Sequence, residues 1–182
     1  DLPIAETVPC SPISPYGYHK YLCDTLVDEY SIVYGLNTAT LRIFSAYGEG
    51  LRRQVLYDLC CKFSDPATRT VEVYGTGNET RDFIHAVDVA RAIDVIIAAG
   101  CQGVVNVASG SQRSIGQVAG LIRSCLGNDK DMRFTGRVRA GEPLYWEADI
   151  SQLKNMGFQP CYTLETGIAN YCRWFQALQR GE

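Results

Sequence analysis

The strongest constraint on the fold is an alternation of segments with helical spacing of apolar residues and short runs rich in β-branched residues. Alternation of this kind is typical of α/β proteins, in which helices cover a largely parallel sheet. We expect helices over residues 15–35, 51–63, 87–99, 115–127, 150–157 and 164–175, and strands over 38–44, 70–77 and 103–109. Two runs of strand followed by helix therefore predict part of a parallel sheet.

Local signals support the helix boundaries. The helix starts carry three capping patterns: Ser14 before Pro15, Ser114 with Gln117, and Asp149 with Gln152. Apolar residues recur at helical spacing in the first helix, at Leu22, Leu26, Tyr30 and Val33, and on one face of residues 87–99, at Val89, Ile93, Ile96 and Ile97. Asp82, His85 and Asp88 are expected to organise the turn and the start of the helix that follows them.

Composition excludes several classes of protein. The 182 residues are 46% apolar and 20% charged, which is enough for one sizeable core, and the net charge of -3 with dispersed basic residues argues against a nucleic-acid binder. No apolar run approaches a membrane span, and residues 1–10 do not have the pattern of a signal peptide. The eight cysteines form no C-x-x-C pair and only His19 and His85 accompany them, so we expect free thiols, no metal, and a soluble cytosolic protein.

Tyr16 and Lys20 lie four residues apart at the start of the first helix, so their side chains share one helical face. One ammonium about 5 Å from a phenol, in an effective dielectric of ~20, contributes about 3 kcal/mol. A phenol that acts as a base near neutrality needs about 4 kcal/mol. The pair could therefore supply a general base, although Y-x-x-x-K by itself also arises by chance in helices.

Longer segments narrow the interpretation. "LPIAETVPCSPISPYGYHK", "LRIFSAYGEG", "VYGTGNETRDFIHAVDVARAI", "VVNVASG" and "RAGEPLYWEADISQLKNMGF" follow one another at separations that resemble the extended short-chain dehydrogenase/reductase family. Within that family they are similar to the NAD-dependent sugar-nucleotide epimerases and dehydratases, over essentially the whole chain. The resemblance implies the C-terminal part of a Rossmann-type doubly wound parallel sheet plus a small α/β substrate-binding domain.

The resemblance also implies roles for individual residues. Tyr16 would be the catalytic acid/base, and Lys20 would hold the nicotinamide ribose and favour the phenolate. Phe44 should lie near the nicotinamide, so the implied cofactor-binding residues are Tyr16, Lys20 and Phe44.

Four further positions would bind the nucleotide sugar. Tyr74 would line the nucleotide base, and Arg81 and Arg139 would grip the diphosphate with forked donors. Ser45 stands where many members have an asparagine that contacts the diphosphate, which makes the substrate contact less secure. Glu49 likewise replaces a common proline, which we expect to loosen its turn.

The glycine-rich dinucleotide loop and the family's catalytic serine or threonine are expected upstream of residue 1. The turn at 109–120 joins a strand to a helix, but its glycines do not fit a dinucleotide fingerprint. We therefore expect residues 1–50 to complete a dinucleotide-binding domain whose N-terminal half is absent. Residues 51–182 would mainly form the substrate domain, with residues around 83–109 returning to the Rossmann sheet.

The implied activity is NAD-dependent rearrangement of a nucleotide sugar, with UDP-hexose 4-epimerisation favoured and a homodimer as the assembly. Several alternatives stay open. The reaction could be that of a 4,6-dehydratase or a decarboxylase on the same scaffold, and the cofactor could be NADP. The chain could also be a non-catalytic sugar-nucleotide-binding homologue or fragment.

Overall fold

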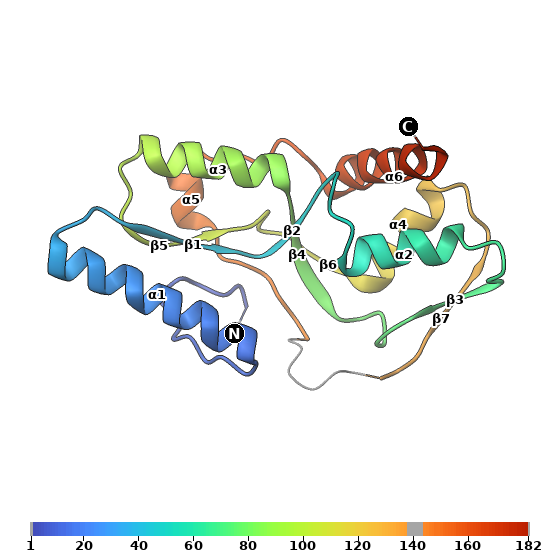
Figure 1. Cartoon of the computed structure of the whole chain (residues 1–182), viewed down its shortest axis with the longest axis horizontal. Helices are drawn as coiled ribbons and strands as arrows, with labels where there is room; N and C mark the ends of the chain where they lie inside the picture. The colour runs from blue at the N-terminus through green and yellow to red at the C-terminus, as the bar shows by residue number, and fades with distance from the viewer. Residues whose placement is uncertain (1, 138–143, 182) are drawn as a thin grey trace.

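The computed structural model describes residues 2–137 and 144–181, and it has the expected α/β organisation (Figure 1). In chain order the elements are α1 (Pro15–Tyr34), β1 (Ala39–Ile43), β2 (Ser45–Tyr47), α2 (Gln54–Ser64), β3 (Thr70–Val73), β4 (Thr80–His85), α3 (Ala86–Ala98), β5 (Gly103–Val107), β6 (Gln112–Ser114), α4 (Ile115–Cys125), β7 (Asp131–Phe134), α5 (Ser151–Asn155) and α6 (Leu164–Arg180). Every helix and strand expected from the sequence is present, with shifted ends.

The strands form parallel pairs, as the alternation predicts. β1 pairs with β5 in parallel register, from Ala39 opposite Gly103 to Ile43 opposite Val107. β3 pairs with β7 in the same sense, and β4 lies between parallel β2 and antiparallel β6. Sequence reasoning did not find β2, β4, β6 and β7. Two of them have three residues each, too few for a periodic pattern, and β4 buries a carboxylate in its middle.

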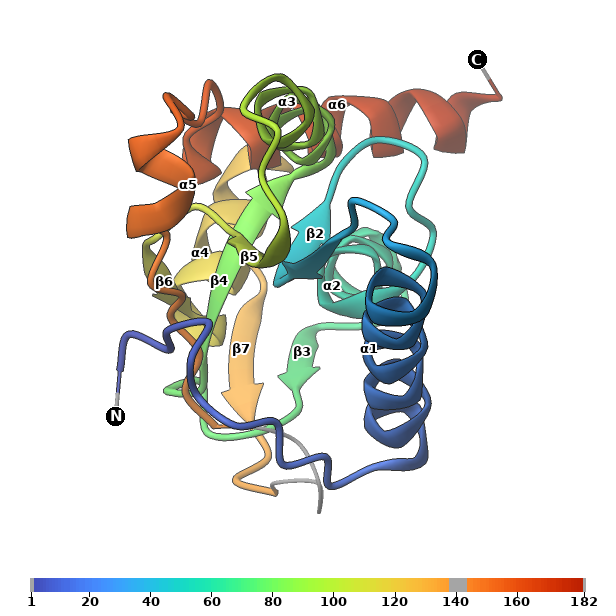
Figure 2. The same cartoon turned by 90° about the vertical axis from the view of Figure 1, so that its left-hand side faces the viewer.

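Two hydrophobic cores hold these elements. The first brings α2, α4 and α6 together over β3, with Leu59, Phe63, Val71, Ile122, Tyr171 and Phe175 fully buried. The second lies between α3, β4, β5 and α5, with Ile84, Ala92, Ile96, Val105, Val107 and Leu153 buried. Figures 1 and 2 show α3 and α1 on opposite faces of the β1–β5 pair.

Helix α1 begins and ends where its sequence signals predict. Ser14 Oγ accepts the backbone N–H of Gly17 at 3.1 Å, Pro15 occupies the first turn, and Gly35 closes the helix at φ 64°. None of its residues is buried in the structure. The apolar stripe is open instead, with exposed fractions of 58%, 54%, 51% and 62% at Leu22, Leu26, Tyr30 and Val33.

The expected apolar face of residues 87–99 is only partly correct, since Ile96 is buried and Val89 packs against the second core. In α3 the buried residues are Asp88, Ala92 and Ile96, whereas Ile93 and Ile97 are exposed. The helix is turned because the carboxylate of Asp88 accepts the backbone N–H groups of residues 161 and 162, at 2.9 and 3.0 Å, and has to face inward to reach them.

One of the two expected capping boxes forms. Ser114 accepts from the backbone N–H of Gln117 while the Gln117 side chain accepts from Ser114 N–H, at 3.1 and 2.9 Å. The box at Asp149 is wrong, because Ile150 is the residue that caps α5 and no side chain bonds there. Asp149 instead accepts the N–H of Ser151 at 2.8 Å, the short-range bond that aspartate makes in turns.

The open stripe on α1 predicts how the isolated chain behaves. We expect residues 1–182 alone to associate in solution, since contiguous exposed apolar surface is buried by self-association and β1 has one edge unpaired within the described residues. Sedimentation velocity should show Leu26→Lys shifted toward monomer relative to wild type. Thr25→Lys, on the neighbouring exposed position, is the control. A monomeric wild-type chain that melts cooperatively would contradict this expectation.

Candidate active site

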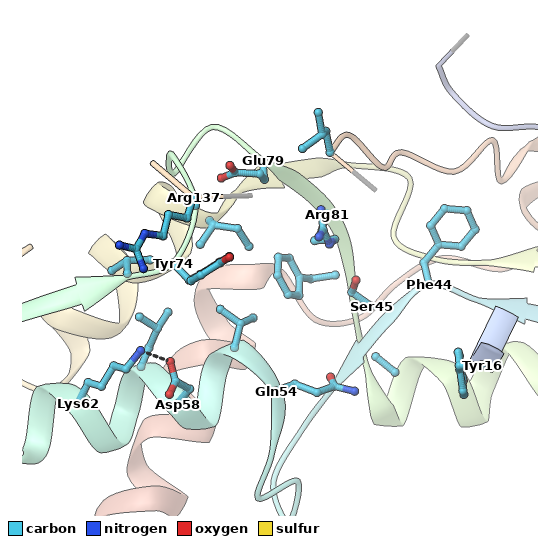
Figure 3. Close-up of a pocket in the computed structure, with 18 of the residues that line it drawn as sticks. Tyr16, Phe44, Ser45, Gln54, Asp58, Lys62, Tyr74, Glu79, Arg81 and Arg137 are labelled. Carbon is cyan, nitrogen blue, oxygen red and sulfur yellow. Dashed lines mark ion pairs between the residues drawn. The ribbon is translucent and has the colours of Figure 1, made fainter. Parts of the chain in front are cut away.

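A cavity of about 870 Å³ lies where α1, the β1–β2 junction, α2 and the β3–β4 turn meet (Figure 3). Five of the seven residues expected from the sequence line it: Tyr16, Phe44, Ser45, Tyr74 and Arg81. Lys20 lies one helical turn beyond Tyr16, and Arg139 lies outside the described residues. The structure thus gathers residues from distant parts of the chain, and their individual roles stay predictions.

Tyr16 lines one end of the cavity, and Lys20 lies one helical turn further along α1. Lys20 Nζ lies 5.6 Å from the centroid of the Tyr16 ring, a separation at which an ammonium and a π face attract. Tyr16 is 71% exposed and also lines the cavity, so the phenol is accessible to a ligand. The two groups neither point apart nor lie sealed in apolar packing.

Phe44 and Ser45 join the cavity at the end of β1. The backbone N–H of Phe44 donates to the carbonyl of Val107 at 3.0 Å, which continues the pairing with β5, and its ring meets Trp146 edge to face at 5.4 Å. Ser45 begins β2 opposite Phe83 of β4. The step from one strand to the next therefore directs these two adjacent side chains to the cavity (Figure 3).

Gln54 is a cavity residue that sequence reasoning missed. It opens α2 with φ of 66°, a left-handed conformation that few non-glycine residues adopt, and its side chain lies near Ser45 in Figure 3. Glutamine has no special preference for this conformation, so no residue-type signal pointed to it. Asp58 and Lys62 follow on the same helix face at i+4 and i+8, and their ion pair is 2.6 Å long.

The far end of the cavity is built on the turn after β3. Tyr74 is followed by Gly75, Thr76 and Gly77, and Glu79 holds this turn by accepting from the backbone N–H groups of Thr76 and Gly77 at 2.8 and 2.9 Å. Although partial burial works in the opposite direction, these bonds lower the pKa of Glu79 from its usual range.

Arg81 and Arg137 place positive charge in the cavity, in addition to Lys62, whose ammonium is paired with Asp58. Arg81 is part-buried on β4, where its Nη1 donates to the carbonyl of Thr80 at 2.9 Å, and Arg137 lies beside Tyr74 in Figure 3. The sequence reasoning had not singled out Arg137. An end of a cavity that carries an aromatic ring and two guanidinium groups suits a planar, anionic ligand.

Of the three residues expected to organise this turn and helix start, His85 caps α3, whereas Asp82 and Asp88 bond segments elsewhere in the chain. Asp82 is fully buried, and burial raises the pKa of its carboxyl even though Ser109 donates to it with both N–H and Oγ–H, at 2.8 and 2.7 Å. His85 accepts the N–H of Val87 at the start of α3. Its Nε2 lies 3.1 Å from a carboxylate oxygen of Glu49, so Glu49 tethers the turn that we expected it to loosen.

Neither a metal centre nor a membrane helix is found in the part of the chain that the structure covers. Among residues 2–137 and 144–181, no group of three or more His, Cys, Asp and Glu side chains is arranged to hold a metal ion. No helix in these ranges is both long and apolar enough to cross a bilayer.

Comparison with known proteins connects this geometry to a family. Residues 1–108 match the model of the NAD dependent epimerase/dehydratase family. The chain is 31% identical over 182 residues to dTDP-glucose 4,6-dehydratase of Xanthomonas campestris pv. campestris, covering 93% of this chain and 51% of that protein. It is 27% identical over 182 residues to an uncharacterized UDP-glucose epimerase of Bacillus subtilis, with coverages of 98% and 57%.

Solved structures of epimerases and dehydratases are also similar to this chain. UDP-N-acetylglucosamine 4-epimerase from Methanobrevibacter ruminantium M1, in complex with UDP-N-acetylmuramic acid, superimposes with a TM-score of 0.88 at 26% identity, covering 98% of this chain and 58% of that one. A dTDP-glucose 4,6-dehydratase from Streptomyces venezuelae with NAD bound gives 0.87 at 25% identity, with coverages of 98% and 55%. The chain spans about half the length of the curated relatives it matches, 57%, 57% and 51% for three of them.

The Glu79 turn generates a pH prediction. Because the folded-state pKa of Glu79 is lowered, its contribution to stability is present above the usual glutamate range and is lost as pH falls through the folded-state value. We expect Glu79→Gln to destabilise the protein by about 1 kcal/mol near neutral pH, allowing for solvent screening. Denaturant unfolding should show this difference shrinking in acid; a difference that stays constant with pH would contradict it.

Proposed function

Because the chain belongs to the NAD-dependent epimerase/dehydratase family, we propose that the whole protein rearranges a nucleotide sugar, with 4-epimerisation of a UDP-hexose as the favoured reaction. The observation that carries the proposal is the single cavity that joins the Tyr16 phenol at one end to Tyr74 and Arg81 at the other. A sugar bound next to Tyr16 would then have its diphosphate and base directed toward the far end.

The residues present fit the nicotinamide end of NAD, the cofactor of the family. Lys20 is exposed beside Tyr16 and has donors for ribose hydroxyls, and Phe44 offers an aromatic face at the same end of the cavity. When bound, NAD supplies the acceptor and donor of a hydride at the sugar carbon.

The chain's own residues would move the proton. The Oη of Tyr16 takes the proton of the sugar hydroxyl as that carbon is oxidised and returns it after the opposite face is reduced. Lys20 supports this exchange because its positive charge favours the phenolate while the proton is held. Ser45 and Gln54, at the middle of the cavity, are placed to hydrogen-bond the sugar or its phosphate.

We also propose that the chain is divided into a cofactor-binding part and a substrate-binding part, as the sequence predicts. Residues 1–50, with the return at about 83–109, would complete the cofactor domain, and residues 51–182 would mainly hold the nucleotide sugar. Support comes from the parallel pairing of β1 with β5 in one core and the packing of α2, α4 and α6 in the other. Tyr74, Arg81 and Arg139 would belong to the part that binds the nucleotide sugar.

The open stripe on α1, formed by Leu22, Leu26, Tyr30 and Val33, supports a homodimer in which this helix meets its copy. Dimerisation would remove apolar side chains from water that this chain leaves exposed. A cytoplasmic location is proposed with it, supported by eight free cysteines, which suit a reducing compartment.

A 4,6-dehydratase is the second candidate, and the 31% identical relative of that name favours it. Both reactions begin with the same oxidation of the sugar, so Tyr16 would serve either. Product analysis separates them: an epimerase returns a hexose of the same composition, whereas a dehydratase releases water and leaves a keto-deoxy sugar. A decarboxylase would release carbon dioxide, and a binding homologue would retain both ligands without any product.

Tyr16→Phe tests the proposal directly. In the full-length protein, assayed with UDP-, GDP- and dTDP-sugars, we expect turnover to fall by about 10²–10⁴ because the proton-transferring group is gone. Binding of NAD and of the sugar nucleotide should persist. Tyr18→Phe, on an exposed position of the same helix, is the control and should keep full activity. Equal turnover in wild type and Tyr16→Phe would show that the assigned role is wrong.

Arg81→Gln tests the far end of the cavity. Loss of a diphosphate contact should raise KM for the UDP-sugar by about ten- to a hundredfold, with a smaller effect on kcat, because the contact is made in both ground and transition states. Arg113→Gln is the control, since Arg113 lies opposite Arg81 on β6 but outside the cavity lining. An unchanged KM in Arg81→Gln would remove this residue from the substrate site.

A further inference from the structure

Arg42 is at the centre of a polar network on the face of β1 that α1 covers. Its Nη1 donates to the backbone carbonyl of Glu6 at 3.0 Å, and its Nε lies 3.9 Å from Oδ2 of Asp24 on α1. This Nε is buried and makes no hydrogen bond within the described residues. The nearby carboxylate of Asp24 is therefore the group that offsets its charge.

Asp24 has a second cation within reach. It lies four residues after Lys20, which lies four residues after Tyr16, so the three side chains follow one another along one face of α1. In the structure the Asp24 carboxylate pairs with Arg42, while Lys20 Nζ lies over the Tyr16 ring at 5.6 Å from its centroid. The net positive charge near the phenol therefore depends on whether Asp24 pairs with Arg42 or with Lys20.

We propose that Arg42 is a positioning residue for the proton transfer: by holding the carboxylate of Asp24, it keeps the ammonium of Lys20 available to Tyr16. This inference rests on the proposed function, because Tyr16 has to be the group that exchanges the proton. Without Arg42, Lys20 would become the cation nearest to Asp24. An ammonium that is paired with a carboxylate offers little net charge to a phenolate, so Tyr16 would deprotonate less readily.

The other charged groups around this network do not change partner when Arg42 is removed. The carboxylate of Glu6 accepts the backbone N–H of Asn106 at 3.0 Å, on β5, so it is already engaged. The other titratable groups next to these residues on α1 are all exposed: His19, Tyr21, Cys23 and Asp28. Removal of Arg42 therefore changes the local charge chiefly by releasing Asp24.

The test compares Arg42→Gln, Asp24→Asn and the double variant in the full-length protein. The acidic limb of log kcat/KM against pH reports the ionisation of the base in the free enzyme. We expect Arg42→Gln to move the midpoint of this limb upward by about one pH unit, which is a roughly tenfold loss on its acidic side. Asp24→Asn should restore the midpoint in the double variant, and by itself should leave it unchanged, because Arg42 already offsets that carboxylate.

A second readout needs no turnover. The near-ultraviolet absorbance of tyrosinate, taken as the difference from the same protein carrying Tyr16→Phe, follows ionisation of this phenol directly. The midpoints should fall in the same order in both experiments, with Arg42→Gln highest and the double variant back at the wild-type position.

Arg133→Gln is the matched control, because Arg133 also extends from a strand to a carboxylate, that of Glu72, but on the exposed surface. Its midpoint should equal that of wild type. Arg42→Lys, which keeps the charge and loses the fork, should stay within about 0.3 pH units of wild type. A role limited to stability would lower the melting temperature of Arg42→Gln without moving either midpoint, and that result would overturn the inference.

Two further results would also overturn it. The first is a double variant whose midpoint stays as high as that of Arg42→Gln. The second is a midpoint that falls by about one pH unit in Asp24→Asn alone, which would mean that Asp24 already weakens the effect of Lys20 in the wild type. The midpoint of Asp24→Asn tests the inference even if Arg42→Gln does not fold. Full turnover by Tyr16→Phe would instead contradict the proposed function, so the two failures are distinguishable.

Discussion

The carboxylate of Asp82 is fully buried, and the atoms that satisfy it come from two segments far along the chain. Ser109 and Gly110 donate to it after β5, and the N–H of Ala148 donates from the segment before α5, at distances from 2.7 to 3.3 Å. A buried carboxylate without partners would cost at least several kcal/mol, so Asp82 can be buried only where these segments meet. Arg81 precedes Asp82 on β4, so the bonds that hold Asp82 also hold the strand from which Arg81 reaches the cavity.

Two other buried polar side chains act in the same way. Asp88 accepts backbone N–H groups from residues 161 and 162, and the amide of Asn106 donates to the carbonyls of Ile4 and Asp149 at 2.9 and 3.1 Å. Each one ties an irregular segment to a strand or helix of the second core. Backbone groups of these irregular segments, which would otherwise be unpaired away from water, find their partners in the three buried side chains.

The helix that carries Tyr16 is anchored differently from the rest. The three helices of the first core each bury one apolar face, whereas α1 has no buried residue and meets chiefly β1. Asp24 on this helix pairs with Arg42 of β1, which also donates to the carbonyl of Glu6 in the segment before the helix. A site placed on such a helix depends on electrostatic tethering within this chain and on whatever covers the outer face of the helix in the whole protein.

The sequence by itself determined the elements whose signals are local. Ser14, Pro15 and Gly35 delimit α1, Ser114 and Gln117 begin α4, and the spacing of Tyr16 and Lys20 places both on one face, because caps and i, i+4 pairs involve residues a few positions apart. The ordered motifs also indicated the family and five of the residues that line the cavity. Tertiary structure decided which way α3 faces, since Asp88 turns inward to meet residues 161 and 162. It also decided the left-handed conformation of Gln54, the tether from Glu49 to His85 and the pairing of Asp24 with Arg42. These contacts join residues between 18 and 74 positions apart, and no local pattern in a single sequence encodes which distant groups will meet.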